Sequence, residues 1–156
     1  MNKATCNKVW LAAIAFIFAL LMVGGSIVNV HAAEPAQADV KIDAQNFPDE
    51  TFRNYITQHF DSNEDDALSP EEIAAAKTVN LADDNSVKSV QGIELLPALT
   101  EINVSGTAIS GIDVTKNPEL KKLNASMCYI FDDDYNMDYL LTSIDVTQNP
   151  KLEYLD

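Results

Sequence analysis

The chain has 156 residues, and its 24 acidic side chains outnumber 10 basic ones, which gives a formal net charge of −14 at pH 7. An acidic surface of this kind repels nucleic-acid phosphates and anionic lipids, so the composition argues against a protein that binds either through a basic patch. The length allows one modest domain or two small ones.

The N-terminus has the layout of a secretory signal peptide. Lys3 and Lys8 precede an apolar run over residues 9–23, and small residues follow. We predict that residues 1–32 are removed by cleavage after Ala32, with residues 36–38 as a second acceptable site, and that the protein is secreted or displayed at the cell surface. The alternative is an uncleaved membrane anchor over residues 9–30, which is about long enough to span a bilayer.

Cleavage would remove two lysines and no acidic residue, which changes the formal charge from −14 to −16. Cys128 would then be the one remaining cysteine, so we expect no internal disulfide. Residues 33–41 are polar, alanine-rich and contain Pro35, and they are predicted to form a linker.

A helix is predicted after the linker. Asn46 can cap it with Pro48 in the first turn, and four apolar side chains then recur at helical spacing. These are Phe52, Tyr55, Ile56 and Phe60. His59 is interpreted as a surface or packing residue, because no nucleophile with a base accompanies it, and we expect no enzymatic activity.

Residues 61–72 have the spacing of a twelve-residue calcium loop, in which alternate positions supply oxygen ligands and the last is a glutamate. The predicted Ca²⁺ ligands are Asp61, Asn63, Asp65, the backbone carbonyl of Ala67, Ser69 and Glu72. Leu68 fits the position that turns an apolar side chain inward. Asp66 departs from the pattern, since the loop normally has glycine at this position to adopt a positive φ. Aspartate in that conformation destabilises the loop by about 1 kcal/mol relative to glycine.

The same segment has an alternative interpretation without metal. Ser69 can act as the N-cap of a short helix that begins at Pro70, with Glu72 completing a capping box, and the loop would then be a solvated acidic turn. With either interpretation, residues 42–78 form a helix-loop-helix cap of EF-hand type, and residues 79–156 form the next region.

The second region contains an internal repeat. Residues 99–104 recur as 120–125, an offset of 21 positions, and residues 112–120 recur as 144–152, an offset of 32. The apolar spacing fits the leucine-rich repeat, with Thr107 and Cys128 at the asparagine position of successive coils. We expect Cys128 to be a buried stacking residue, Asn117 and Asn149 to be turn residues, and Asp113 and Asp145 to be structural.

The larger offset places an insertion between Cys128 and Leu141, with four aspartates and four aromatic residues. We predict a solvated acidic loop, with a second weak cation site as the alternative. The aromatic side chains favour a partner contact at this loop, because insertions in solenoids gather on one face. They are Tyr129, Phe131, Tyr135 and Tyr139.

The features that carry a family resemblance are residues 46–49, 52–55 and 92–94, the calcium-type loop, and the repeats of the form Ile-Asp-Val-Thr-x-Asn-Pro-x-Leu. With these features the sequence resembles the secreted leucine-rich repeat proteins of Gram-positive gut bacteria. The resemblance covers about residues 42–156 and implies an EF-hand-like cap followed by repeats. It also implies a secreted or cell-surface protein that presents its repeat surface to other macromolecules. Ala125 departs from the pattern, since cysteine is frequent there, and the chain stops inside the opening strand of a coil.

The predicted fold class is therefore α+β, with a helical EF-hand-like cap and a short leucine-rich repeat solenoid. The predicted function is an adhesion-type interaction module with a calcium-stabilised cap and a protein or glycan partner. The alternatives are a calcium sensor or buffer, and the N-terminal part of a larger surface protein whose active domain is missing. An open last coil would favour self-association.

Overall fold

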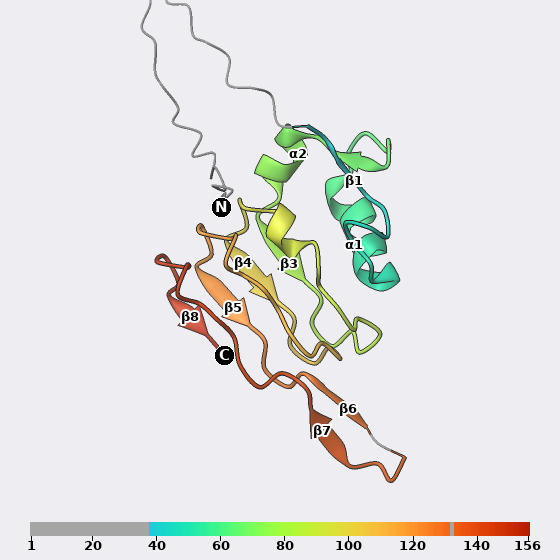
Figure 1. Cartoon of the computed structure of the whole chain (residues 1–156), viewed down its shortest axis with the longest axis vertical. Coiled ribbons are helices and arrows are strands. Elements are labelled where there is room, and N and C mark those ends of the chain that lie inside the picture. Colours follow the sequence, from blue (N-terminus) through green and yellow to red (C-terminus); the bar gives the residue numbers. More distant parts are fainter. Residues whose placement is uncertain (1–37, 132) are drawn as a thin grey trace, which may run out of the picture. The chain divides into compact units, whose positions relative to one another are not determined.

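The computed structural model describes residues 38–131 and 133–156, and the predicted signal peptide lies outside this part of the chain. The elements in chain order are β1 (Val40–Lys41), α1 (Glu50–Phe60), β2 (Ala67–Leu68), α2 (Pro70–Ala75), β3 (Thr78–Asn80), the 3₁₀-helix η1 (Ile93–Leu95), β4 (Glu101–Asn103), β5 (Lys122–Asn124), β6 (Tyr129–Phe131), β7 (Met137–Tyr139) and β8 (Tyr154–Leu155) (Figure 1). Strand β1 contains the last two residues of the predicted linker. Among the described residues, no helix has the length and apolar character needed to cross a membrane.

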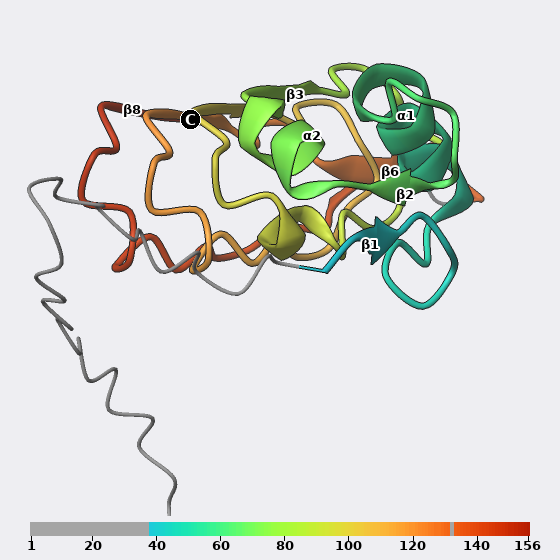
Figure 2. The same cartoon turned by 90° about the horizontal axis from the view of Figure 1, so that it is seen from above.

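The repeats form a four-stranded parallel sheet with the order β3-β4-β5-β8. Ile102 pairs with Leu123, which confirms the offset of 21, and Leu123 pairs with Leu155, which confirms the offset of 32. Each strand is only two or three residues long, and the chain returns through turns and η1 on the other side of the coil (Figure 2). Parallel strands joined in this way stack one coil on the next, so each coil covers its neighbour's apolar side chains.

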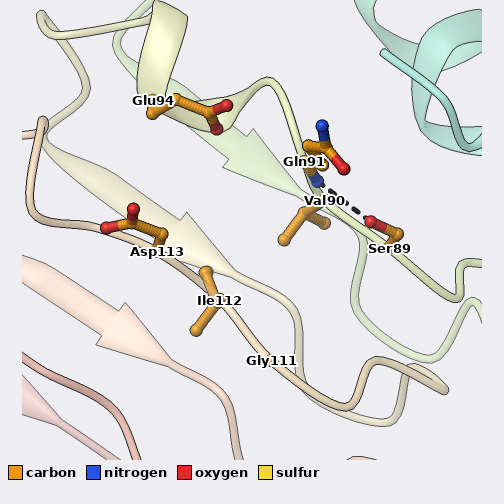
Figure 3. A pocket seen from close by; sticks show the side chains of 7 residues that line it. All are labelled: Ser89, Val90, Gln91, Glu94, Gly111, Ile112 and Asp113. Atoms are coloured by element: carbon orange, nitrogen blue, oxygen red, sulfur yellow. Dashed lines mark hydrogen bonds between the residues drawn. The ribbon is translucent and has the colours of Figure 1, made fainter. Parts of the chain in front are cut away.

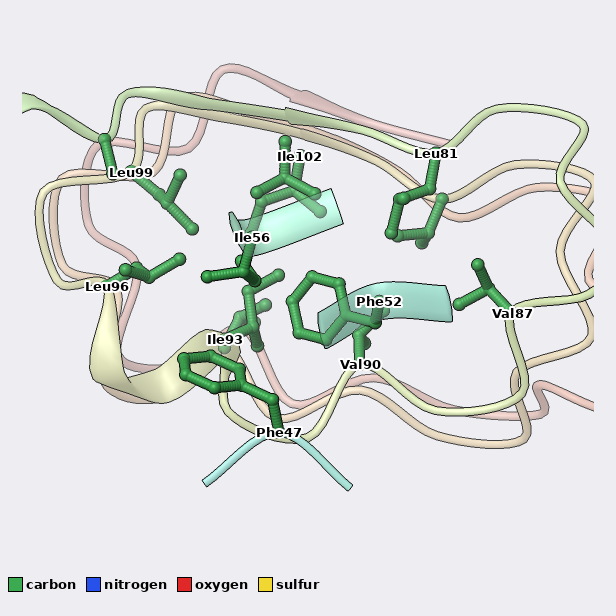
Figure 4. Packing of buried hydrophobic residues seen from close by; sticks show 14 of the residues in the cluster. Phe47, Phe52, Ile56, Leu81, Val87, Val90, Ile93, Leu96, Leu99 and Ile102 are labelled. Atoms are coloured by element: carbon green, nitrogen blue, oxygen red, sulfur yellow. The ribbon is translucent and has the colours of Figure 1, made fainter. Parts of the chain in front are cut away.

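The helical cap lies at the β3 end of the stack (Figure 2). Phe52 and Ile56 of α1 are completely buried, and they belong to the same cluster as Ile93 and Ile102 of the coils (Figure 4). Burial of each such side chain contributes about 1.5–3 kcal/mol. The cap and the first coils are therefore held together by one hydrophobic core.

Asp49 is the N-cap of helix α1, and its carboxylate accepts the backbone N–H of Phe52 at 2.9 Å. The prediction that Asn46 caps this helix is wrong, because the Asn46 side chain donates instead to a backbone carbonyl of β1 at 2.8 Å. Asp49 has a second role, since it also accepts the N–H groups of Lys88 and Ser89 at 2.9 and 3.1 Å. One carboxylate thus caps α1 and fastens it to the first coil.

Gly92 lies where the first coil meets the cap. Its φ of 103° is in the left-handed region that favours glycine. A Cβ atom at this position would lie 2.4 Å from the Phe47 ring and 2.5 Å from the carbonyl oxygen of Asn46. Close approach of the cap to the coil therefore requires glycine here.

Asn117 and Asn149 are more than turn residues, which corrects the interpretation from sequence. Both are buried, and the Asn117 side chain donates to the carbonyls of Ile93 and Leu96 at 3.1 and 2.8 Å. Asn149 donates in the same way to Val114 and Asn117 at 2.8 and 2.9 Å. Each of these carbonyls also accepts one backbone N–H, so the amide supplies a second donor and links its own coil to the preceding one.

The insertion after Cys128 contains two strands that the prediction of a solvated acidic loop missed. Strands β6 and β7 pair antiparallel, with Tyr129 opposite Tyr139 and Phe131 opposite Met137. Figure 1 shows this hairpin extending away from the parallel sheet. A signal was present in the sequence, since two short apolar runs flank a turn rich in aspartate and asparagine.

Candidate functional site

The predicted calcium loop lies between α1 and α2 and is shaped by its own hydrogen bonds. Asp61 is buried, and its two carboxylate oxygens accept the backbone N–H groups of Asp65 and Asp66 at 3.2 and 3.0 Å. Asp66 has a φ of 61°, the conformation that the glycine position of such a loop requires. The chain therefore turns around the Asp61 carboxylate.

Glu72 closes the loop from the first turn of α2. Its Oε1 atom accepts the N–H and the O–H of Ser62, both at 2.7 Å. Its Oε2 atom accepts the N–H and the O–H of Ser69, both at 2.9 Å. These hydrogen bonds to the charged form, the Ser62 hydroxyl first among them, lower the pKa of Glu72 to about 2. Glu72 is therefore ionised at neutral pH although it is buried.

Ser69 completes the predicted capping box of α2, because it also accepts the backbone N–H of Glu72 at 3.3 Å. Leu68 is fully buried, as the calcium-loop pattern predicts. Strand β2 pairs antiparallel with β1, with Leu68 opposite Val40. The middle of the loop is thus fixed by a strand from the segment that precedes the cap.

Of the remaining predicted ligands, Ala67 is half-buried in β2, and the other two lie at the surface. Asn63 and Asp65 are exposed, and the Asn63 amide donates to the Asp65 carboxylate at 2.8 Å. Within residues 38–131 and 133–156, no group of three or more His, Cys, Asp or Glu side chains is placed so that it could hold a metal ion. The loop therefore has the predicted backbone turn and two buried carboxylates, but the carboxylates of Asp61, Asp65 and Glu72 all accept hydrogen bonds from the loop itself.

A second candidate surface is the outward face of the parallel sheet. The middle residues Val79, Ile102 and Leu123 are buried, so their strand neighbours point the other way. One row of these neighbours is in register across all four strands and consists of Thr78, Glu101, Lys122 and Tyr154. We call this set the strand row. Glu101 and Lys122 form an ion pair at 3.0 Å within it.

The coil interior holds the predicted stacking residues. Thr107 and Cys128 are buried and stack with 3.6 Å between Oγ1 and Sγ. The Cys128 thiol also faces the backbone carbonyls of Val104 and Ala125 at 3.4 and 3.2 Å, which confirms its predicted environment. Burial raises the pKa of the Cys128 thiol, so it is a structural group and not an activated nucleophile.

A shallow pocket of about 250 Å³ lies between the first and second coils (Figure 3). Glu94 and Asp113 are the two acidic residues that line it. Glu94 accepts the N–H of Gly92 at 2.8 Å, and Asp113 accepts the hydroxyl and N–H of Thr115 at 2.6 and 2.9 Å. The bonds from Thr115 hold the pKa of Asp113 below its usual value. Both carboxylates therefore accept hydrogen bonds within turns of the coil, which agrees with the structural role predicted for Asp113.

His59 is held against its own helix. Its Nδ1 atom lies 2.9 Å from the Tyr55 carbonyl oxygen, and its ring stacks on the Tyr55 ring with 4.0 Å between centroids. These contacts agree with the interpretation of His59 as a packing residue.

Comparison with known proteins supports the repeat fold. No protein-family model matches the sequence, and neither does any curated protein. Solved structures do match, and one is an internalin, InlF, from Listeria monocytogenes, with 23% identity and a TM-score of 0.57 over 76% of this chain. Another is the functional domain of InlJ from the same species, which includes a cysteine ladder, with 26% identity and a TM-score of 0.54 over 78% of this chain.

The matched region covers 32% of the InlF structure and 29% of the InlJ structure, so this chain corresponds to about a third of each. Together with the parallel sheet and the register of its strands, the match shows that this chain contains a leucine-rich repeat fold similar to that of internalins.

Proposed function

We propose that this chain is a secreted or cell-surface interaction module that contacts a protein or glycan through its leucine-rich repeats and is stabilised by Ca²⁺ in its helical cap. The observation that carries the interaction role is the strand row, because four parallel strands hold its side chains in register at a regular spacing. A solenoid presents such rows as an extended binding surface. The likeness to internalins supports the same role, and the proposal includes no enzymatic activity.

The interaction role is tested by probing arrays of immobilised oligosaccharides and extracellular proteins with the whole chain. Lys122→Glu reverses the charge in the strand row, and Lys116→Glu is the matched control, since Lys116 is exposed on the return side of a coil. We expect captured partners to lose binding to Lys122→Glu and to keep it with Lys116→Glu. Equal binding by both variants would contradict a role for the strand row.

Calcium binding is supported by the donor chemistry of the loop. Asp61, Asn63, Asp65, Ala67, Ser69 and Glu72 offer hard oxygen atoms, which Ca²⁺ prefers over nitrogen or sulfur. Asp66 already has the required positive φ, and Glu72 is ionised at neutral pH, so no proton competes with the cation there. Binding would require Asn63 and Asp65 to exchange their mutual hydrogen bond for contacts to the ion.

The size of the calcium effect follows from mass action. Extracellular calcium modules bind at roughly 10⁻⁴–10⁻³ M, and a site of about 0.1 mM affinity at about 1 mM free ion adds about 1.4 kcal/mol of stability. Calorimetric titration and thermal melting of the whole chain measure this effect. We expect Asp61→Ala and Glu72→Gln to abolish the heat and the melting shift, and Asp133→Asn in the hairpin to preserve both. An unchanged response in Asp61→Ala would place any calcium site elsewhere.

A calcium sensor is the weaker candidate. Sensors expose a groove when a pair of helix-loop-helix units opens. In the described part of the chain there is one such unit, and its β2 pairs with β1 instead of with a second calcium loop. Because Phe52 and Ile56 of α1 are buried in the repeat core, opening of the helices would also expose that core.

A further inference from the structure

The hairpin formed by β6 and β7 has two different faces. In an antiparallel pair, opposite residues share a face, and so do residues two apart on one strand. The pairing of Tyr129 with Tyr139 and of Phe131 with Met137 therefore places these four side chains on one face, which we call the aromatic hairpin face. Ile130 and Asp138 lie opposite each other on the other face.

The aromatic hairpin face is exposed although it is apolar. Phe131 is 55% exposed, Tyr139 63% and Met137 39%. The rings of Tyr129 and Phe131 meet edge to face with 5.2 Å between centroids, so the surface has a defined shape. Apolar groups concentrated on one exposed face are typical of an interaction site.

The base of the hairpin is fixed to the stack. The Tyr129 N–H donates to the Thr107 carbonyl at 3.1 Å, and the Leu140 N–H donates to the Cys128 carbonyl at 2.9 Å. The Asn85 side chain, from the first coil, donates to the Tyr129 carbonyl at 2.9 Å. The aromatic hairpin face is thereby held in place before any partner arrives, which lowers the entropic cost of binding.

The negative charge around the hairpin restricts which kind of partner could bind to the aromatic hairpin face. No lysine or arginine occurs from residue 123 to residue 150, whereas Asp133 and Asp138 are exposed on the hairpin itself. A second copy of this chain would bring the same negative charge and be repelled. A neutral glycan would gain nothing from the charge. Arginine and lysine are attracted both by the carboxylates and by the faces of aromatic rings.

We propose that the aromatic hairpin face docks a cationic protein segment in which arginine or lysine alternates with apolar side chains. The apolar side chains of the segment cover Phe131, Met137 and Tyr139, and its cationic groups lie over the rings and near Asp133 in the turn, since Asp138 lies on the opposite face. This surface is separate from the strand row and does not depend on the calcium loop.

The test uses the whole chain and a fluorescent peptide of alternating arginine and leucine, with a glutamate-leucine peptide of the same length as the matched control. Fluorescence anisotropy should show binding of the arginine peptide only, and the affinity should fall as salt is added. Phe131→Ser and Tyr139→Ser should each weaken binding by about tenfold or more, as residues at the centre of an interface do. Ile130→Ser, on the opposite face, should change it by less than about twofold.

Several results would overturn the proposal. These are equal binding of both peptides, and equal loss of binding in Ile130→Ser and Phe131→Ser. Self-association that Phe131→Ser abolishes in light scattering would assign the surface to a second copy. Binding of cello-oligosaccharides with the same sensitivity to Phe131→Ser would assign it to a glycan. Loss of arginine-peptide binding in Glu101→Lys, with retention in Phe131→Ser, would place binding on the strand row.

Discussion

The calcium-type loop and the repeat coils both hold buried polar groups, but their partners lie at different separations in the sequence. Glu72 is satisfied by Ser62 and Ser69, ten and three residues away. The side-chain N–H groups of Asn117 donate to carbonyls 24 and 21 residues earlier, and those of Asn149 to carbonyls 35 and 32 residues earlier. The loop can therefore form its polar contacts locally, whereas a coil forms them only when the preceding coil is in place.

The largest expected effect tests whether the two regions unfold together. Phe52→Ala removes a fully buried ring of α1 from the core it shares with the coils, and should cost about 3–5 kcal/mol. Urea unfolding followed by circular dichroism should show one transition at lower denaturant. Phe131→Ala, at an exposed ring, serves as the control and should cost less than about 1 kcal/mol. Two separate transitions in Phe52→Ala would mean that the cap and the coils are independent.

The next effect isolates the contacts between coils. Asn117→Ala removes two hydrogen bonds to the carbonyls of Ile93 and Leu96, each of which keeps one backbone donor, and should cost about 1–3 kcal/mol in urea unfolding. Asn54→Ala, at an exposed position of α1, should change stability by no more than about 0.5 kcal/mol. If both variants were equally stable, the asparagine amides would not hold the coils together.

A pH titration examines the loop side of the comparison. Because the pKa of Glu72 is lowered to about 2 from 4.5, its contribution is present above pH 4.5 and is lost as the pH falls towards 2. Glu72→Gln should therefore cost about 2 kcal/mol at pH 7, the value of hydrogen bonds to a charged group, and less at pH 2. Glu71→Gln, at the exposed neighbouring position, is the control. If the loss of stability in Glu72→Gln were the same at pH 7 and pH 2, the ionised carboxylate would not be its cause.

The smallest effect concerns the strand row. The Lys122–Glu101 ion pair is about half exposed on both sides, so Lys122→Ala should cost less than about 1 kcal/mol, and less at high salt. A double-mutant cycle with Glu101→Ala, measured by thermal melting, gives the coupling directly. A coupling well above 1 kcal/mol would mean that the strand row contributes to folding and not only to recognition.

The sequence by itself determined the features that depend on local spacing. The alternating oxygen positions of residues 61–72, the positive φ at Asp66, the capping box of Ser69 and Glu72, and the offsets of 21 and 32 between coils could all be predicted. Each follows from a fixed number of residues between chemical groups, so it can be read without knowledge of distant contacts. The calcium ion itself remains a proposal.

Only the tertiary structure decided the features that depend on distant partners. The Asp49 carboxylate, which caps α1, also accepts the N–H groups of Lys88 and Ser89, about forty residues away. The Asn117 side chain donates to a carbonyl of the coil before it. The hairpin is likewise anchored by Thr107 and Asn85. The sequence pattern does not reveal which distant carbonyl or amide will need a partner, because that need arises only when packing removes the group from water.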